Sequence, residues 1–169
     1  MHDYKVGAEI GVGGGVFSEM ICQRNPGVKL FCVDAWEVYE GYDDFLIPEY
    51  LEDDYKRAIL RLAPYKVNII RKYSMDAVQD FADGSLDFVY IDGNHKSPYI
   101  VDDIREWSPK VRSGGIVSGH DYVDIHQDVI VAVNDYVNGH HCRPLFLVGN
   151  LNEHGDAEMS LCSWFWVQP

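Results

Sequence analysis

The stretch KVGAEIGVGGGVFS, residues 5–18, decides the fold of this chain. It predicts a short buried strand, a glycine-rich turn and the start of a helix. Glycine suits such a turn because it adopts positive φ angles and lets a ligand approach the backbone closely. The free N–H groups at the start of the following helix would face whatever occupies the turn. This arrangement is typical of the first strand–turn–helix unit of a nucleotide-binding sheet, whose ligands bind at the carboxyl ends of the strands.

Two cofactor classes compete for this turn. The dinucleotide fingerprint G-x-G-x-x-G, counted from Gly11, requires a glycine where the chain has Val16. The pattern that fits is E-x-G-x-G-x-G, formed by Glu9, Gly11, Gly13 and Gly15. It resembles the first motif of the class I methyltransferases that use S-adenosylmethionine (SAM). The resemblance implies that these residues bind the cofactor, with the acid near the cationic end of SAM. A glycine-rich turn without a ligand is the alternative.

The composition is that of a globular protein. The 169 residues suggest one domain with an adequate core, and 47% of them are hydrophobic. No apolar run approaches the about 20 residues of a membrane-spanning helix, and the N-terminus lacks a signal-peptide pattern. The four cysteines are dispersed without a C-x-x-C pair, which favours a reduced, cytoplasmic protein.

The net charge of −13 argues against nucleic acid as a substrate. Binding to a phosphate backbone needs a basic surface, and the sequence contains no basic cluster. We therefore expect a small-molecule acceptor, and neither a membrane nor a nucleic acid as a partner.

A carboxylate follows the second predicted strand, residues 29–33. In the sequence, Asp34 follows Gly11 at about the spacing that is typical of an acid in nucleotide-binding sheets. Such an acid accepts hydrogen bonds from the ribose hydroxyls of a bound nucleoside. SAM carries such a ribose, so we predict that Asp34 binds the cofactor, together with Ala35 and Trp36. The acidic and aromatic connection over residues 36–55 would wall the pocket. A turn aspartate and a surface flap are the alternatives that need no ligand.

Strands alternate with helices along the chain, which predicts a parallel α/β sheet. Helices are expected over residues 16–24, 52–63, 97–107 and 127–138, and further strands over 67–71, 86–92 and 116–119. The first helix should bury one apolar face, formed by Val16, Phe17, Met20 and Ile21. Two late strands, near 145–148 and 160–167, predict an antiparallel hairpin. The fold class is thus a Rossmann-like class I methyltransferase sheet, mostly parallel with a C-terminal antiparallel hairpin and helices on both faces.

Ser74 and Met75 follow the third strand, at a junction that contacts the adenine ring in the resembling family. The resemblance implies that both bind the cofactor, with Met75 over the ring face, although a methionine after a strand is more often core filling. Asp102 and Asp103 sit early in a helix, where a favourable interaction with the helix dipole accounts for them.

The phrases YIDGNH, residues 90–95, and GHDY, residues 119–122, end two neighbouring strands. They resemble a branch of the family that contains small-molecule O-methyltransferases. Metal-dependent members place an acid after the fourth strand and an Asp-Asp or Asp-Asn pair after the fifth. By resemblance the metal ligands are Asp92, His120 and Asp121, with Asp92 also at the cofactor. Histidine in that pair is a departure, so magnesium, manganese and no ion all stay open.

Methyl transfer from a sulfonium requires an aligned acceptor with a free lone pair. A hydroxyl acceptor also gains from a general base or a metal. We predict His120, Asp92 and His95 as catalytic residues, with one histidine as the base if no metal binds. The expected function is SAM-dependent methylation of an oxygen atom of a small molecule. The alternatives are an NAD(P)-dependent oxidoreductase, disfavoured by Val16 and by the lack of a Tyr-x-x-x-Lys pair, and a SAM-binding subunit without catalysis.

Members of the resembling family usually carry helices before the first strand, which help to cover the cofactor. Here the first strand begins almost at once. We therefore expect residues 1–169 to form a single SAM-binding domain with an open site, or one whose cover comes from another chain. An uncovered edge is compatible with a homodimer.

Overall fold

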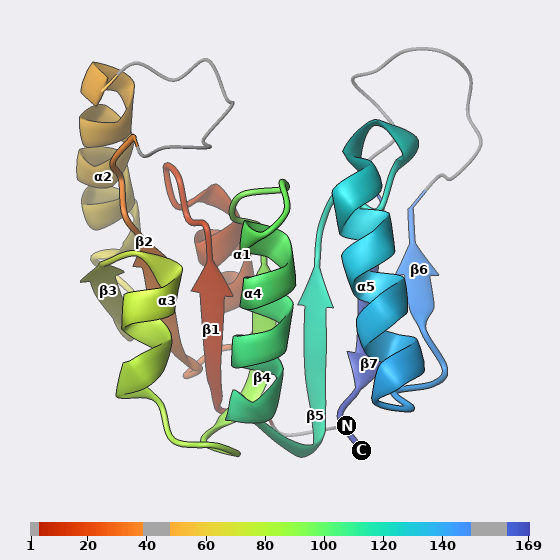
Figure 1. Ribbon diagram of the computed structural model, residues 1–169. Coiled ribbons are helices and arrows are strands. Elements are labelled where there is room, and N and C mark those ends of the chain that lie inside the picture. The colour runs from red at the N-terminus through yellow and green to blue at the C-terminus, as the bar shows by residue number, and fades with distance from the viewer. Residues whose placement is uncertain (1–3, 39–47, 150–161) are drawn as a thin grey trace.

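The computed structural model describes residues 4–38, 48–149 and 162–169, and within them the chain forms one seven-stranded sheet (Figure 1). The strand order is β3-β2-β1-β4-β5-β7-β6. The parallel strands are β1 (Val6–Ile10), β2 (Lys29–Asp34), β3 (Val67–Arg71), β4 (Leu86–Ile91) and β5 (Val111–Gly119). Strands β6 (Phe146–Val148) and β7 (Ser163–Val167) pair antiparallel at one edge. The predicted fold class is confirmed; the segment that joins the last two strands lies outside the described residues.

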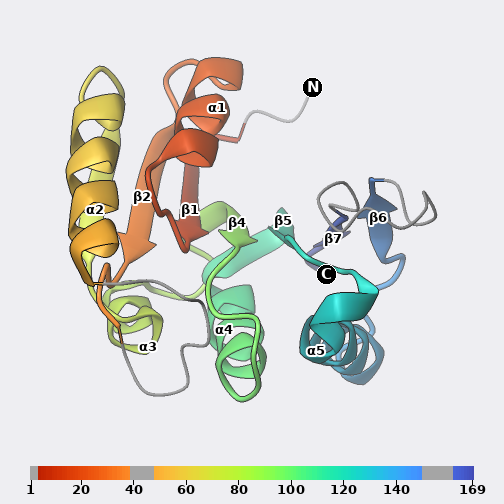
Figure 2. The ribbon, with the colours of Figure 1, turned by 90° about the horizontal axis from the view of Figure 1, so that it is seen from above.

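Helices cover both faces of this sheet (Figure 2). On one face lie α1 (Val16–Arg24) and α2 (Pro48–Leu62), and on the other α3 (Ser74–Ala77), α4 (Tyr99–Trp107) and α5 (Gln127–Gly139). Short 3-10 turns follow or precede them: η1 (Val78–Asp80), η2 (Ser108–Lys110) and η3 (Asp124–His126). A hydrophobic core lies on each side of the sheet, and the larger one is built with α4 and α5. No helix among the described residues is long and apolar enough to cross a bilayer.

Helix α1 turns differently about its axis than the apolar pattern predicted. In α1, Val16 and Met20 are 56% and 47% exposed, and the buried residues are Ser18 and Cys22. The predicted inner face of α1 is therefore wrong for Val16 and Met20, whereas Ile21 packs against the core and Phe17 contacts the Tyr90 ring. The physical reason is polar: the Ser18 hydroxyl donates a hydrogen bond to the buried carboxyl group of Glu9, which fixes this face of α1 against the sheet.

Strand β1 meets the end of β4 at Gly11, where the two backbones approach closely. A Cβ atom at this position would lie 2.1 Å from the carbonyl oxygen of Asp92, and φ is +85°. Only glycine combines this positive φ with so close an approach. The Asp92 N–H donates to the Ile10 carbonyl at 2.7 Å, so the two strand ends are tied at the same point.

We expect Gly11→Ala to lower the free energy of unfolding by about 2 kcal/mol or more, because the new methyl group meets backbone atoms that cannot move aside. Gly27→Ala is the matched control. Its φ is +87°, and no described atom lies within 4 Å of the added Cβ, so it should lose only about 1 kcal/mol from backbone strain. Urea denaturation measures both. Equal losses in the two variants would contradict the close packing at Gly11.

Candidate functional site

A cavity of about 390 Å³ opens at the carboxyl ends of β1 to β4. This is the edge of an open α/β sheet at which ligands bind. Most residues predicted to bind the cofactor or to act in catalysis line it: Glu9, Gly11, Gly13, Asp34, Ala35, Trp36, Ser74, Asp92 and His95. Four predicted site residues are not among the described residues that line it: Gly15, Met75, His120 and Asp121.

The glycine turn forms one wall of the cavity. Gly13 has φ +50°, and no described atom lies within 4 Å of the position that its Cβ would take, so the missing side chain leaves open space. Gly15 does something different, because an added Cβ would lie 3.2 Å from the backbone of Ala58. Gly15 therefore lets α1 pack closely on α2, whereas Gly13 keeps room for a ligand.

Asp34 and Trp36 brace this turn. One carboxylate oxygen of Asp34 accepts hydrogen bonds from the N–H groups of Val12 and Gly13, at 2.8 and 2.9 Å. The other accepts the N–H of Trp36 at 2.8 Å, and the Trp36 indole donates back to the Gly13 carbonyl at 2.9 Å. A carboxylate has about four lone-pair positions. Three are used here, which leaves one for a ligand hydroxyl. The bracing was not foreseen from the sequence, and the predicted ribose contact stays a prediction.

Glu9 is a buried acid at the base of the turn, with 1% of its surface exposed. Burial raises the pKa of its carboxyl group to about 8; the Ser18 hydrogen bond opposes the rise, and the negative charges of Asp92 and Asp34 add to it. The carboxyl group is therefore mostly protonated at neutral pH. A cation in the cavity would favour its ionised form.

A second buried acid lies on the α4 side of the cavity. Asp103 accepts a hydrogen bond from the Ser74 hydroxyl, which in turn accepts one from the Trp107 indole at 2.8 Å. Burial raises the pKa of the Asp103 carboxyl to about 7, against the lowering effect of Ser74. Since Ser74 donates its only proton to Asp103, it presents lone pairs to further donors. Met75 packs against the hydrophobic core, in line with the core-filling alternative.

The sequence analysis missed Asp103, which both lines the cavity and is buried. Its position was assigned to a helix-dipole effect. The available signal was its spacing in α4, because Asp103 follows Ile100 by three residues and precedes Trp107 by four, which places it on the buried face.

Four polar side chains gather where β4 and β5 end. Nε2 of His95 lies 2.9 Å from Oδ2 of Asp121 and 3.5 Å from Oδ1 of Asp92. Nδ1 of His120 lies 3.1 Å from Oδ1 of Asp121 and 3.9 Å from Oδ1 of Asp92. The structure thus brings together the residues predicted to be catalytic or metal-binding. Their roles stay predictions.

These four side chains, Asp92, His95, His120 and Asp121, form the strand-end cluster, and their charges shift one another's pKa values. Burial would lower the pKa of His95, but the carboxylates of Asp121 and Asp92 outweigh it and raise the pKa to about 9. The hydrogen bond to Asp121 raises the pKa of His120 as well. Burial opposes ionisation of Asp121, yet both histidines together hold its pKa below the usual range. In this state, protons on the imidazoles supply the positive charge that balances the carboxylates.

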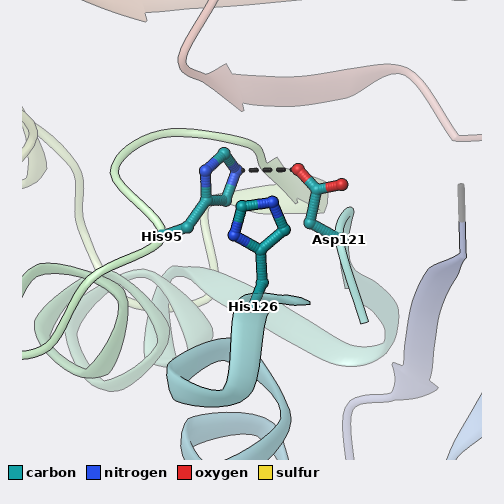
Figure 3. Close-up of side chains that lie close together, drawn as sticks. All are labelled: His95, Asp121 and His126. Carbon is teal, nitrogen blue, oxygen red and sulfur yellow. Dashed lines mark ion pairs between the residues drawn. The ribbon is translucent and has the colours of Figure 1, made fainter. Parts of the chain in front are cut away.

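A further histidine reaches the same place. His126, the last residue of η3, points toward His95 and Asp121 (Figure 3). Two groups of three residues could each hold a metal ion, with their ligand atoms within 4.8 Å of one another: Asp92, His120 and Asp121, and His95, Asp121 and His126. The first group is the predicted one. The second was missed because His126 lies outside the GHDY phrase, in the turn that precedes α5.

Comparisons with known proteins place the fold in context. The O-methyltransferase from Bacillus cereus in complex with SAH has a TM-score of 0.68 at 14% identity, over 98% of this chain and 74% of that one. An rRNA methylase from Streptococcus thermophilus has a TM-score of 0.67 at 13% identity, over 99% of this chain and 89% of that one. At these identities the likeness shows the fold alone.

Similarity in sequence identifies the family of this chain. A protein of Sinorhizobium fredii named y4gI, described as uncharacterized, is 26% identical over 121 residues, which are 69% of this chain and 12% of that protein. This chain therefore spans only a small part of that relative. Residues 8–122 match a family described as a methyltransferase domain. The matched segment runs from β1 through the glycine turn to the residues after β5 and includes Glu9, Asp34, Asp92 and Asp121. The chain belongs to the methyltransferase domain family.

Proposed function

We propose that this chain is a SAM-dependent methyltransferase that transfers the methyl group to an oxygen atom of a small molecule. The observation that carries the proposal is the strand-end cluster, which lies at the cavity with His95 and Asp92 on its wall. An oxygen nucleophile is the acceptor that gains most from a base or a cation, because its proton must leave.

The residues of the cavity fit SAM. The open space at Gly13 admits a ligand against the backbone of the turn, and Asp34 keeps one acceptor position for a ribose hydroxyl. Glu9 provides a carboxyl group that ionises readily beside a positive charge. When bound, SAM supplies a methyl group on a cationic sulfonium. The acidic wall formed by Glu9, Asp34 and Asp92 therefore complements the charge of the cofactor.

The second part of the proposal concerns the proton that the acceptor hydroxyl must lose when it is methylated. With a pKa of about 9, His95 already carries a proton at neutral pH and is a poor base in that state. The proposal therefore includes a divalent cation held by Asp92, His120 and Asp121, whose carboxylates supply the oxygen ligands that magnesium and manganese prefer. Such a cation lowers the pKa of a nearby hydroxyl when bound. If no cation binds, His120 or His95 must first lose its own proton before it can take that of the acceptor.

The family match leaves the nicotinamide-dependent oxidoreductase without support. A small molecule is favoured over RNA because the net charge of −13 repels a phosphate backbone, although similar folds occur in proteins described as rRNA methylases. A SAM-binding subunit without catalysis stays an outcome of the tests below. Cytoplasmic location, a homodimer and a cover from another chain stay predictions.

We expect Gly13→Val to weaken SAM binding at least about 100-fold, or roughly 3 kcal/mol, because the side chain would fill the cavity. Gly27→Val is the matched control, since it carries a similar positive φ in open space but does not line the cavity. Isothermal titration with SAM, beside circular dichroism of each variant, measures the effect. If folded Gly13→Val binds SAM as the control does, the glycine turn is not the cofactor site.

The affinity for SAM should rise with pH between about 6 and 8 and level off above that range. The raised pKa of Glu9 means that the empty site holds a proton below about pH 8, and binding the cationic cofactor releases it. Each pH unit in this window should change the dissociation constant by up to about tenfold. Glu9→Gln removes the titrating group and should flatten most of the dependence. The measurement is titration at several pH values in buffers of different ionisation enthalpy; a pH-independent wild type would contradict a neutral Glu9.

Turnover should require a divalent cation and an oxygen acceptor. We expect Asp121→Asn to lower kcat at least about 100-fold while SAM affinity changes less than about threefold, because Asp121 does not line the cavity. Methyl transfer from labelled SAM to a panel of phenols, sugars, carboxylates and amines is measured after exhaustive chelation, then with added magnesium or manganese. Full activity in the chelated enzyme would exclude the metal. Transfer to amines alone, or to none of the panel, would count against an oxygen acceptor.

A further inference from the structure

We propose that His95, Asp121 and His126 form a binding site for a divalent transition-metal ion such as Zn²⁺ or Co²⁺. This site is distinct from the set Asp92, His120 and Asp121 in the proposed function. It requires neither SAM nor an acceptor, so it stands or falls by itself.

The three side chains come from separate segments and converge on one point. His95 follows β4, Asp121 follows β5, and His126 ends η3; Figure 3 shows the three pointing toward one another. The rings of His95 and His126 lie 4.7 Å apart at 42°, so they meet at an angle and are not stacked flat. Ligand atoms on a tetrahedral Zn²⁺ with bonds of about 2.1 Å are about 3.4 Å apart. The observed separations, at most 4.8 Å, need only modest side-chain rotations to reach that value.

Asp121 can serve this site without giving up the other one. Its Oδ2 faces His95 at 2.9 Å, and its Oδ1 faces His120 at 3.1 Å, so each oxygen belongs to a different group. The neighbouring backbone is fixed: the His120 N–H donates to the Ile91 carbonyl at 3.2 Å, and the Tyr122 N–H to the Cys162 carbonyl at 3.0 Å. Asp121 itself has φ +57°, which is uncommon for a residue with a side chain. The carboxylate is thus held in one orientation between two sets of nitrogens.

His95 supplies an independent indication of a ligand. Its Nε2 atom is buried and makes no hydrogen bond in the described part of the chain, although it lies 2.9 Å from Oδ2 of Asp121 in an ion pair. A metal ion between this nitrogen, Asp121 and His126 would satisfy it. It would also balance the charge of Asp121 with a cation in place of a proton.

The ligand set selects the class of metal. Two imidazole nitrogens and one carboxylate oxygen suit zinc, cobalt, nickel and iron(II), whereas magnesium and calcium prefer oxygen ligands throughout. Three protein ligands leave at least one coordination position for water or another small ligand. Since His95 lines the cavity, a bound ion would also join that wall to the start of α5.

Titration of the chelated, SAM-free protein with Co²⁺ tests the site, because bound Co²⁺ absorbs visible light according to its ligands. We expect one tight site that Zn²⁺ displaces. His126→Gln and Asp121→Asn should weaken it at least about tenfold. His120→Gln, which alters only the other group, is the matched control and should change the dissociation constant less than about threefold.

The proposal is overturned if the wild type binds no Co²⁺ tightly, if His126→Gln binds it unchanged, or if His120→Gln weakens binding as much as His126→Gln does. Thermal melts show whether each variant is folded. Zn²⁺ should raise the Tm of the wild type and of His120→Gln, and should not raise that of a folded His126→Gln. Because neither SAM nor an acceptor is present, a negative result here leaves the proposed methyl transfer standing, and loss of turnover leaves this site standing.

Discussion

The carboxylate of Asp34 holds two segments of the site in a single arrangement. It accepts the N–H groups of Val12 and Gly13 from the glycine turn and that of Trp36 from the segment after β2. Hydrogen bonds to an ionised acceptor are about twice as strong as neutral ones. The Trp36 indole closes the ring by donating to the Gly13 carbonyl. The open face of Gly13, and with it one wall of the cavity, depends on this ring of hydrogen bonds.

Burial of acids is the second constraint on the site. Glu9 and Asp103 both line the cavity, and burial raises their pKa values to about 8 and about 7. Burying an ionised carboxylate is costly, and binding a proton avoids that cost. Each acid also accepts a serine hydroxyl, from Ser18 and Ser74 respectively, which orients it. At neutral pH Glu9 is therefore mostly protonated and Asp103 partly so, and both respond to the charge of a ligand in the cavity.

The strand-end cluster shows the opposite behaviour. There the charges are close enough to stabilise one another, so Asp121 stays ionised and His95 binds a proton strongly. A cation competes with those protons for the same lone pairs. Folds close to this one occur in an O-methyltransferase and in an rRNA methylase. The sheet itself therefore does not identify the acceptor.

The sequence by itself determined the order of the elements and most of the residues around the cavity. Glycine spacing placed the turn, and the rule that parallel strands end on the same side brought Asp92, His120 and Asp121 together. These features are local, or follow from topology alone. Only the tertiary structure decided which way α1 turns, and so exposed Val16 and Met20, and only it placed Asp103 in the wall of the cavity. It alone brought His126 to His95, because that contact depends on where η3 and α5 pack on the sheet. Packing depends on every neighbour at once, and a periodic pattern in one segment does not contain that information.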